Sequence, residues 1–328
     1  MTNLPLVSVL MPAYNHEKYV QESINSVVAQ TYKNIELIVL DDGSKDNTWQ
    51  KIQEMKTKCE ERFVRVHVET KPNEGLCTTL NKLISLAKGD FIYLLASDDN
   101  PKPHAIETEV NFMQNNPDYV LVVGDNEFIN SNSQRIGWDK HHNSVELSEA
   151  VYKTFGQALQ NHNKDIDFNS SRFGLYETFV TRNYIPNGFL IPIDAMKKVG
   201  GYTKEAPLED WYLHMQLSKI GKYKYIDDVL LSYRWHDNNT VKNKEYMLKI
   251  STDTQKYEEK VVKNLDDKKW YEIYMQQICQ IKMKFNLFNV IKYYSLKNID
   301  NKQYIIELCG RKFIIRTYED KKQIEINQ

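Results

Sequence analysis

Two adjacent aspartates, Asp98 and Asp99, directly follow the apolar run at residues 91–95, and Pro101 comes soon after them. Two like charges at the end of a buried strand are costly unless a positive partner meets them. Carboxylate oxygens suit Mg²⁺ or Mn²⁺, and such a cation can bridge them to a diphosphate. We therefore interpret one carboxylate as an acceptor for a ribose or phosphate group and the other as a metal ligand. A structural alternative stays open, because Asp99 or Asn100 could cap a helix that begins near Pro101.

A second acidic turn, Asp41 and Asp42, follows the apolar run at residues 35–40. A carboxylate at the end of this strand can accept the imide N–H of uracil or an amine of another base, and Asp42 is the better placed of the two. The Gly43 and Ser44 that follow equally suit a turn before a helix, so both interpretations stay open.

A third acidic pair, Glu209 and Asp210, opens a predicted helix whose apolar side carries Trp211, Met215 and Leu217. A carboxylate within hydrogen-bond reach of a hydroxyl group can remove its proton as a general base. Acids in the first turn of a helix are also favoured by the helix dipole alone, which is the structural alternative.

The elements that position these acids alternate over residues 6–124. Apolar runs at 7–11, 35–40, 63–68 and 91–95 predict strands, and stretches with helical spacing lie between them. Strands that are apolar on both faces predict a parallel sheet covered by helices, with ligands gathered beyond the carboxyl ends of the strands. The residues that would share this edge are Pro12, Ala13, Tyr14, Asn15, Asp42, Asn73, Asp98 and Asp99.

The turn after the first strand excludes two phosphate-binding motifs. Residues 11–15 read MPAYN, without the glycines of a dinucleotide-binding turn, and the chain has no P-loop. A phosphorylated ligand in this crevice would therefore need a cation to neutralise it.

The composition limits the classes of partner and the cellular compartment that we expect for this protein. The 328 residues carry 43 Lys and Arg against 44 Asp and Glu, so no excess of positive charge points to nucleic acid. The four cysteines lack zinc-ligand spacing and are expected to be reduced thiols. The N-terminus has neither the basic region nor the apolar core of a signal peptide, and no apolar run is long enough to span a membrane. We expect a cytoplasmic protein, with association with the inner face of the membrane as an option.

Five ordered blocks, VSVLMPAYN, IELIVLDDGSKDNT, KPNEG, KGDFIYLLASDDN and EDWYLHMQL, resemble the inverting family 2 glycosyltransferases with a GT-A fold. The resemblance covers roughly residues 5–240. It implies an α/β GT-A domain over 1–240, with a nucleotide-binding half at 1–125 and an acceptor-binding half at 126–240.

The resemblance also implies roles for individual residues. The nucleoside would be held by Pro12, Ala13, Tyr14, Asp42 and Asn73, the ribose by Asp98, and Mn²⁺ or Mg²⁺ by Asp99 with Asp98. Asp210 would be the base, Glu209 and Trp211 would orient the acceptor, Asn187 and Gly188 would line its pocket, and Arg234 and His236 would lie near the diphosphate or its metal. The alternatives for the last four are an ordinary turn and a surface strand with a solvated histidine.

Two positions depart from the family pattern. Ala96 stands where the family often has a first aspartate, which affects the strength of metal binding. Leu80 stands where an arginine often precedes Asn81, so one positive contact near the nucleotide is either missing or supplied by Lys71 or Lys82 instead.

The function implied is metal-dependent, inverting transfer of one sugar from a nucleotide sugar, which we expect to be UDP-linked, to a surface-glycan or lipid-linked saccharide. The base would remove the proton of the acceptor hydroxyl group while its oxygen attacks from the side opposite the leaving group. Such an attack inverts the anomeric carbon. The alternatives are a nucleotidyltransferase that makes sugar nucleotides and a non-catalytic nucleotide- or glycan-binding module.

The region 241–328 is predicted to be a helical extension that ends in a β-hairpin at 304–318. Residues 282–316 carry eight basic and two acidic side chains, interleaved with aromatic residues. Such a face can rest on anionic lipid headgroups. Alternatively, its aromatic residues pack internally or against a second copy in a homodimer.

Overall fold

The computed structural model describes residues 4–278, 303–308, 311–318 and 321–325. Its contacts divide the chain into two compact units, Met1–Glu258 and Glu259–Gln328. The first unit therefore reaches beyond residue 240, the expected end of the main domain, because the first two thirds of helix α9 (Lys244–Asn264) belong to it.

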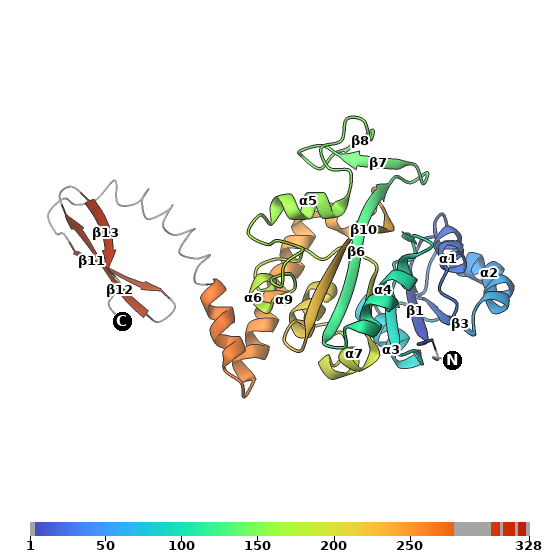
Figure 1. Cartoon of the computed structure of the whole chain (residues 1–328), viewed down its shortest axis with the longest axis horizontal. Coiled ribbons are helices and arrows are strands. Elements are labelled where there is room, and N and C mark those ends of the chain that lie inside the picture. The colour runs from blue at the N-terminus through green and yellow to red at the C-terminus, as the bar shows by residue number, and fades with distance from the viewer. Residues whose placement is uncertain (1–3, 279–302, 309–310, 319–320, 326–328) are drawn as a thin grey trace. The chain divides into compact units, whose positions relative to one another are not determined.

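The first unit is built on one mixed, mainly parallel sheet with strand order β3-β2-β1-β4-β9-β6-β10-β5, and β7 and β8 continue it beside β6. Strands β3, β2, β1 and β4 run parallel, β10 runs parallel to β6, and β9 runs antiparallel to both β4 and β6. The strands are β1 (Val7–Ala13), β2 (Ile35–Asp41), β3 (Arg65–Thr70), β4 (Phe91–Leu94), β5 (Asn100–Pro101), β6 (Tyr119–Ile129), β7 (Arg135–Trp138), β8 (Ser144–Val145), β9 (Phe189–Pro192) and β10 (Lys222–Arg234). Figure 1 shows the long strands β6 and β10 side by side.

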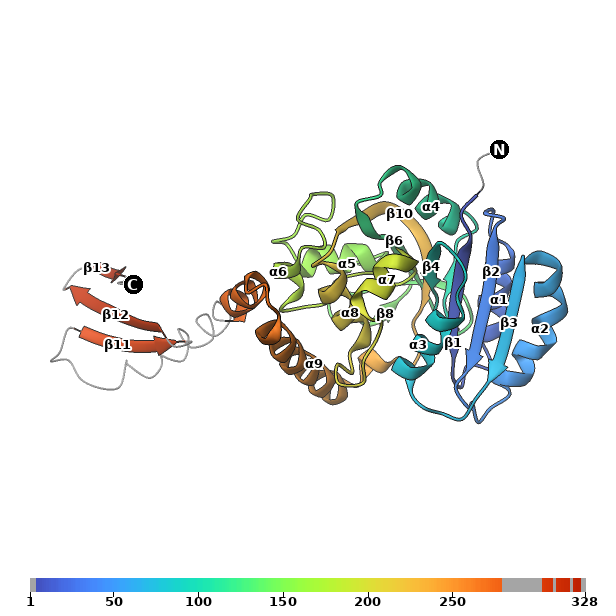
Figure 2. The ribbon, with the colours of Figure 1, turned by 90° about the horizontal axis from the view of Figure 1, so that it is seen from below.

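Helices cover the sheet. They are α1 (Val20–Val28), α2 (Thr48–Arg62), α3 (Leu76–Leu86), α4 (Ala105–Asn115), α5 (Phe155–His162), α6 (Tyr176–Phe179), α7 (Ile193–Val199), α8 (Glu209–Leu217), the 3₁₀ turn η1 (Thr240–Lys242) and α9. Apolar side chains of α1, α2 and α4 share one core cluster with Val7, Val9 and Met11, which places these helices on one face. Helix α3 packs against β1 and β2. Figure 2 shows these two strands beside β3. The prediction of an α/β fold with helices on both faces is confirmed.

The register of the strands explains why the acids meet. Ala13 of β1 pairs with Asp41 of β2, and Asp41 pairs with Thr70 of β3, so the carboxyl ends of these strands lie at one edge. The third strand begins at Arg65, two residues later than the expected start at Phe63. The reason is that Phe63 packs into the core at the end of α2, while Val64 is 61% exposed between the two elements.

The second unit contains a three-stranded antiparallel sheet, β11 (Gln303–Leu308), β12 (Arg311–Tyr318) and β13 (Lys321–Glu325). The expected hairpin is present, and β13 extends it by one strand. Residues 279–302, which hold most of the basic and aromatic side chains noted above, lie outside the described part of the chain. Within the described part, no helix combines the length and apolar character that crossing a membrane requires.

Candidate functional site

A cavity of about 730 Å³ opens at the carboxyl ends of β1, β2 and β4. All but two of the predicted site residues line it: Pro12, Ala13, Tyr14, Asp42, Asn73, Asp98, Asp99, Asn187, Gly188, Glu209, Asp210 and His236. Trp211 and Arg234 do not. The structure therefore gathers into one space residues that are up to 224 positions apart (12 to 236) in the sequence.

Asp42 is fixed as an anionic acceptor. Its carboxylate accepts the backbone N–H groups of Glu74 and Gly75, each at 3.0 Å, and pairs with the buried ammonium group of Lys71. Burial raises the pKa of Asp42, but the hydrogen bonds from Lys71 and Glu74 outweigh it and hold the pKa below its usual range. Gly43 has φ +69°, and a Cβ there would lie 2.8 Å from the backbone nitrogen of Asn73, so only glycine lets the two loops meet.

Lys71 is therefore the positively charged side chain next to Asp42, the residue expected to bind the nucleotide base. The other candidate, Lys82, pairs with Glu69 on β3, and neither lysine is among the residues that line the cavity. Asn81 uses its side chain to bind the backbone of Tyr202 at 2.8 and 2.9 Å, which ties α3 to the loop before α8.

Asp98 faces two histidine rings. His236 Nε2 lies 2.9 Å from one carboxylate oxygen, and His16 Nδ1 lies 3.8 Å from the other. Burial raises the pKa of Asp98, but the hydrogen bond from His236 and the charge of His16 lower it further than burial raises it. Asp98 is therefore ionised and directed at groups that line the cavity.

Asp99 faces the protein instead. One of its oxygens accepts the backbone N–H of Arg234 at 2.9 Å, and the other lies 3.4 Å from the side-chain amide of Asn187. Burial, and then the charge of Asp98, raise the pKa of Asp99 well above its usual range. The geometry thus favours Asp98 over Asp99 as the cation ligand, the reverse of the order expected from the sequence.

Arg234 is not available to a diphosphate, in contrast to the expectation. Its side chain is fully buried, and Nε donates to the backbone carbonyl oxygen of Asp98 at 2.8 Å. Nη1 donates to Asn130 O and Ser133 Oγ, and Nη2 donates to Glu22 at 2.8 Å. A buried guanidinium group needs such partners, and every nitrogen of this one already has a protein oxygen.

His16 is a site residue that sequence reasoning missed. It follows Asn15 in the turn after β1, and its Nδ1 lies 2.8 Å from Ser97 Oγ. Ligand atoms of His16, Asp98 and His236 all lie within 4.8 Å of one another. Two imidazoles and a carboxylate are a donor set that fits a divalent transition ion such as Mn²⁺. In the sequence, the only sign of this role for His16 is its position directly after the turn at residues 12–15.

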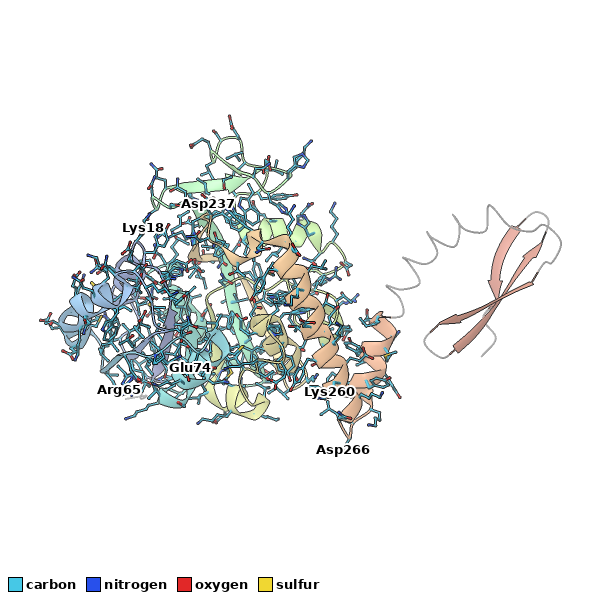
Figure 3. The ribbon with its side chains drawn as sticks, turned by 180° about the vertical axis from the view of Figure 1, so that it is seen from behind. Lys18, Arg65, Glu74, Asp237, Lys260 and Asp266 are labelled. Atoms are coloured by element: carbon cyan, nitrogen blue, oxygen red, sulfur yellow. The ribbon has the colours of Figure 1, made fainter. Side chains whose placement is uncertain are left out.

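The turn before α1 and the segment after β10 meet at this point. The rings of Tyr19 and His236 are stacked with centroids 5.2 Å apart, and the guanidinium group of Arg234 lies over the same tyrosine at 4.7 Å. Lys18 and Asp237 mark these two segments in Figure 3.

Glu209 and Asp210 begin α8 and both line the cavity. Asp210 accepts a hydrogen bond from the Asn183 amide at 2.9 Å and from the backbone N–H of Trp211 at 2.6 Å. Burial raises the pKa of both acids, and the charge of Asp210 helps to raise the pKa of Glu209 to about 8. Both acids therefore hold a proton more readily than a carboxyl group in water, which suits groups that exchange protons with a ligand.

Trp211 is a core residue and does not contact the acceptor pocket, contrary to the expectation. It is 3% exposed, and its indole N–H donates to the carbonyl oxygen of Phe179 at 2.6 Å. Because every residue of α8 from Trp211 to Leu217 is buried, the tryptophan anchors the helix that carries the two acids.

The turn at Asn187 and Gly188 is rigid. Asn187 and Asn126 exchange two hydrogen bonds, at 2.9 and 3.0 Å. Gly188 has φ +72°, and a Cβ there would lie 2.8 Å from the hydroxyl oxygen of Tyr93. The turn therefore offers the cavity a wall that a larger side chain would disturb.

Comparison with known proteins agrees with this fold. The chain is 28% identical over 263 residues to chondroitin synthase of Pasteurella multocida, which covers 80% of this chain and 23% of the relative. S. aureus TarS 1–349 in complex with UDP-GlcNAc superposes with a TM-score of 0.54 at 14% identity, covering 98% of this chain and 100% of that one. Mannosyltransferase PcManGT from Pyrobaculum calidifontis, in complex with GDP-Man and Mn²⁺, gives a TM-score of 0.56 at 12% identity, with coverage of 90% and 82%.

These two structures share the GT-A fold of this chain. The sequence profile of the family described as Glycosyl transferase family 2 matches residues 8–182, more than half of the 328 residues. The chain belongs to glycosyl transferase family 2.

Proposed function

We propose that this glycosyltransferase moves a single sugar, with inversion and with the help of a divalent cation, from a UDP-linked donor to a hydroxyl group of a saccharide or lipid-linked glycan. One observation carries the proposal: a single cavity holds an ionised acceptor for a base (Asp42), a carboxylate between two imidazoles (Asp98) and a pair of acids whose pKa values are raised (Glu209 and Asp210). Binding of a nucleotide, binding of a cation and removal of a proton each have a candidate group.

The base of the donor is proposed to meet Asp42, which lines the cavity, while Lys71 balances the charge of Asp42 from behind. An ionised carboxylate accepts hydrogen bonds and cannot donate them. Uracil presents an imide N–H, so it can donate to this carboxylate. The complex of TarS with UDP-GlcNAc supports a uridine donor, and the complex of PcManGT with GDP-Man shows that the fold also takes guanosine donors.

The cation, Mn²⁺ or Mg²⁺, is proposed to be held by Asp98 and His236. When bound, it would offset the negative charge that develops on the leaving diphosphate. The Mn²⁺ in the PcManGT complex supports this assignment. Arg234 contributes indirectly, because its guanidinium group fixes the backbone carbonyl of Asp98.

Asp210 is proposed to be the general base. The Asn183 amide orients its carboxylate, and its raised pKa makes it a better proton acceptor than a surface aspartate. Glu209, whose pKa is about 8, keeps its proton at neutral pH and can donate a hydrogen bond to the acceptor. The rigid turn at Asn187 and Gly188 would form one wall of the acceptor site.

The acceptor, the location in the cell and the partners of the protein are also proposed. The similarity to chondroitin synthase supports a polysaccharide acceptor, such as a bacterial capsule or lipopolysaccharide chain. Cytoplasmic location, contact of the basic residues 282–316 with anionic lipid and homodimer formation stay proposals. Vesicles with and without anionic lipid, at low and high salt, would test the contact with lipid.

The test of the function begins with a screen of nucleotide sugars with Mn²⁺ or Mg²⁺, scored by slow hydrolysis of the donor without an acceptor. Asp210→Asn should retain nucleotide binding and lose transfer to an added saccharide. The exposed Asp194→Asn is the matched control and should behave as wild type. Transfer by Asp210→Asn at the wild-type rate would show that the base lies elsewhere.

A further inference from the structure

The histidine that follows the first strand lies within reach of a cation at Asp98. Each carboxylate oxygen of Asp98 faces a different ring, His236 at 2.9 Å and His16 at 3.8 Å. The rings come from opposite ends of the first unit's sequence and stand nearly perpendicular to each other, at 84°. Three candidate ligand atoms thus surround one point, all within 4.8 Å of one another.

The backbone before His16 is built to direct it there. Asn15 adopts a left-handed conformation with φ 54°, which asparagine adopts more readily than most other residues apart from glycine. Its N–H donates to Ser44 Oγ at 2.9 Å, and its side-chain oxygen accepts the N–H of Lys45 at 2.8 Å. The N–H of His16 donates to Thr48 Oγ1 at 2.7 Å. The loop after β2 therefore holds this turn in place.

The two rings are also held from the side. Ser97 Oγ lies 2.8 Å from His16 Nδ1, the ring nitrogen that faces Asp98, so a cation bound to this nitrogen would take the place of that hydrogen bond. Tyr19 stacks on His236. Polar and packing contacts of this kind orient the ligands of metal sites.

We propose that His16 is a third protein ligand of the cation, and that the two imidazoles make the site select Mn²⁺ and similar transition ions over Mg²⁺. The proposal rests on the proposed function, since it concerns the cation of that same cavity. Mg²⁺ prefers oxygen ligands and gives up its water reluctantly. Imidazole suits transition ions, and the affinity of a mixed nitrogen and oxygen site rises from Mn²⁺ to the later ions of the series. A site with Asp98 and one imidazole would discriminate less.

The test measures cation binding by the full-length protein without nucleotide, with Mn²⁺ followed by its EPR signal and Mg²⁺ by competition. His16→Gln should weaken Mn²⁺ binding by on the order of 10- to 100-fold and Mg²⁺ binding by less than about threefold. His104→Gln is the matched control, because His104 pairs with Asp228 on the surface and should leave both affinities unchanged. Equal Mn²⁺ affinity in His16→Gln and wild type, or an equal loss for both cations, would overturn the proposal.

A second measurement does not depend on affinity. Pulsed EPR of the Mn²⁺-bound wild type should detect nitrogen couplings from two imidazoles, and His16→Gln should show one. A single imidazole in the wild type would contradict the role of His16. If the wild type binds cation, Asp98→Asn does not and His16→Gln binds normally, only this inference fails. If the wild type binds neither cation nor UDP, the proposed function itself fails.

Discussion

Asp98 and Asp99 are neighbours in the chain, yet their carboxylates have opposite surroundings. Both residues line the cavity, but Asp98 meets the ring of His236 at 2.9 Å, whereas Asp99 accepts the backbone N–H of Arg234 at 2.9 Å. Since Arg234 and His236 are themselves two residues apart on one extended segment, each aspartate binds one of them. Two contacts, one from each aspartate, thus join the acidic pair to the end of β10 and the residues that follow it.

These contacts predict different defects for the two aspartates. Asp98→Asn should abolish measurable cation binding and lower transfer at least about 100-fold, while the fold stays intact. Asp99→Asn should destabilise the fold by about 1–3 kcal/mol, with a smaller loss of cation affinity. Denaturant unfolding and cation titration of both variants check this. The opposite ranking, with cation binding lost only in Asp99→Asn, would contradict the assignment of Asp98.

Lys71 gives the second prediction, which concerns the nucleotide. Lys71→Met removes the cation paired with Asp42, and UDP affinity should fall by on the order of 10- to 100-fold, as expected for the loss of a charge-assisted hydrogen bond. Cation binding without nucleotide should not change. Isothermal titration with UDP measures the effect, and Lys82→Met, which breaks only the surface pair with Glu69, is the control. Unchanged UDP affinity in Lys71→Met would remove this residue from the base site.

Arg234 gives the third. Because its buried guanidinium group donates to Glu22, Asn130 and Ser133, which themselves reach solvent, Arg234→Met should lower the free energy of unfolding by about 1–3 kcal/mol through the loss of these hydrogen bonds. The protein that remains folded should bind UDP with nearly wild-type affinity. A stable variant with selectively weakened UDP binding would instead mean that the arginine contacts the diphosphate.

Glu209 gives a prediction about pH and stability. Burial and the charge of Asp210 raise its pKa from 4.5 to about 8, so between these values the folded protein binds more protons at this site than the unfolded chain. The contribution of Glu209 to stability is therefore present below pH 4.5 and is lost as pH rises towards 8. Glu209→Gln should flatten the pH dependence of unfolding over this window. Glu60→Gln, at a side chain 55% exposed, should not.

The sequence alone predicted the elements whose pattern is local. The apolar runs of β1 and β2 are buried on both faces, as a covered parallel sheet requires, and the acids after them therefore had to share one edge. Asp42, Asp98 and Asp210 were predicted on this basis together with the family resemblance. All three line the cavity.

The residues that the sequence misplaced depend on contacts between distant segments. Arg234 binds Glu22 across 212 positions, and nothing local distinguishes a buried arginine from one that meets a phosphate. His16 becomes a candidate ligand only because the end of β10 returns beside α1. Trp211 was assigned to the acceptor from the family resemblance, whereas its place on the apolar side of the predicted helix was the correct guide, since residues 211–217 are all buried.

His236 gives the last prediction, which concerns the proton on its ring. Its Nδ1 accepts the backbone N–H of Asn238 at 3.2 Å, so in the neutral ring the proton lies on Nε2 and is donated to Asp98. A cation that binds Nε2 must displace that proton, and the neutral ring then carries it on Nδ1, where the Asn238 N–H can no longer donate. Cation binding should therefore switch the tautomer and loosen the turn that follows β10. Long-range nitrogen–proton NMR of histidine-labelled protein, with Zn²⁺ as a diamagnetic probe, should show Nε2–H before addition and Nδ1–H after it. His104 serves as the internal control, and an unchanged Nε2–H signal at saturating Zn²⁺ would mean that His236 orients Asp98 without binding the cation.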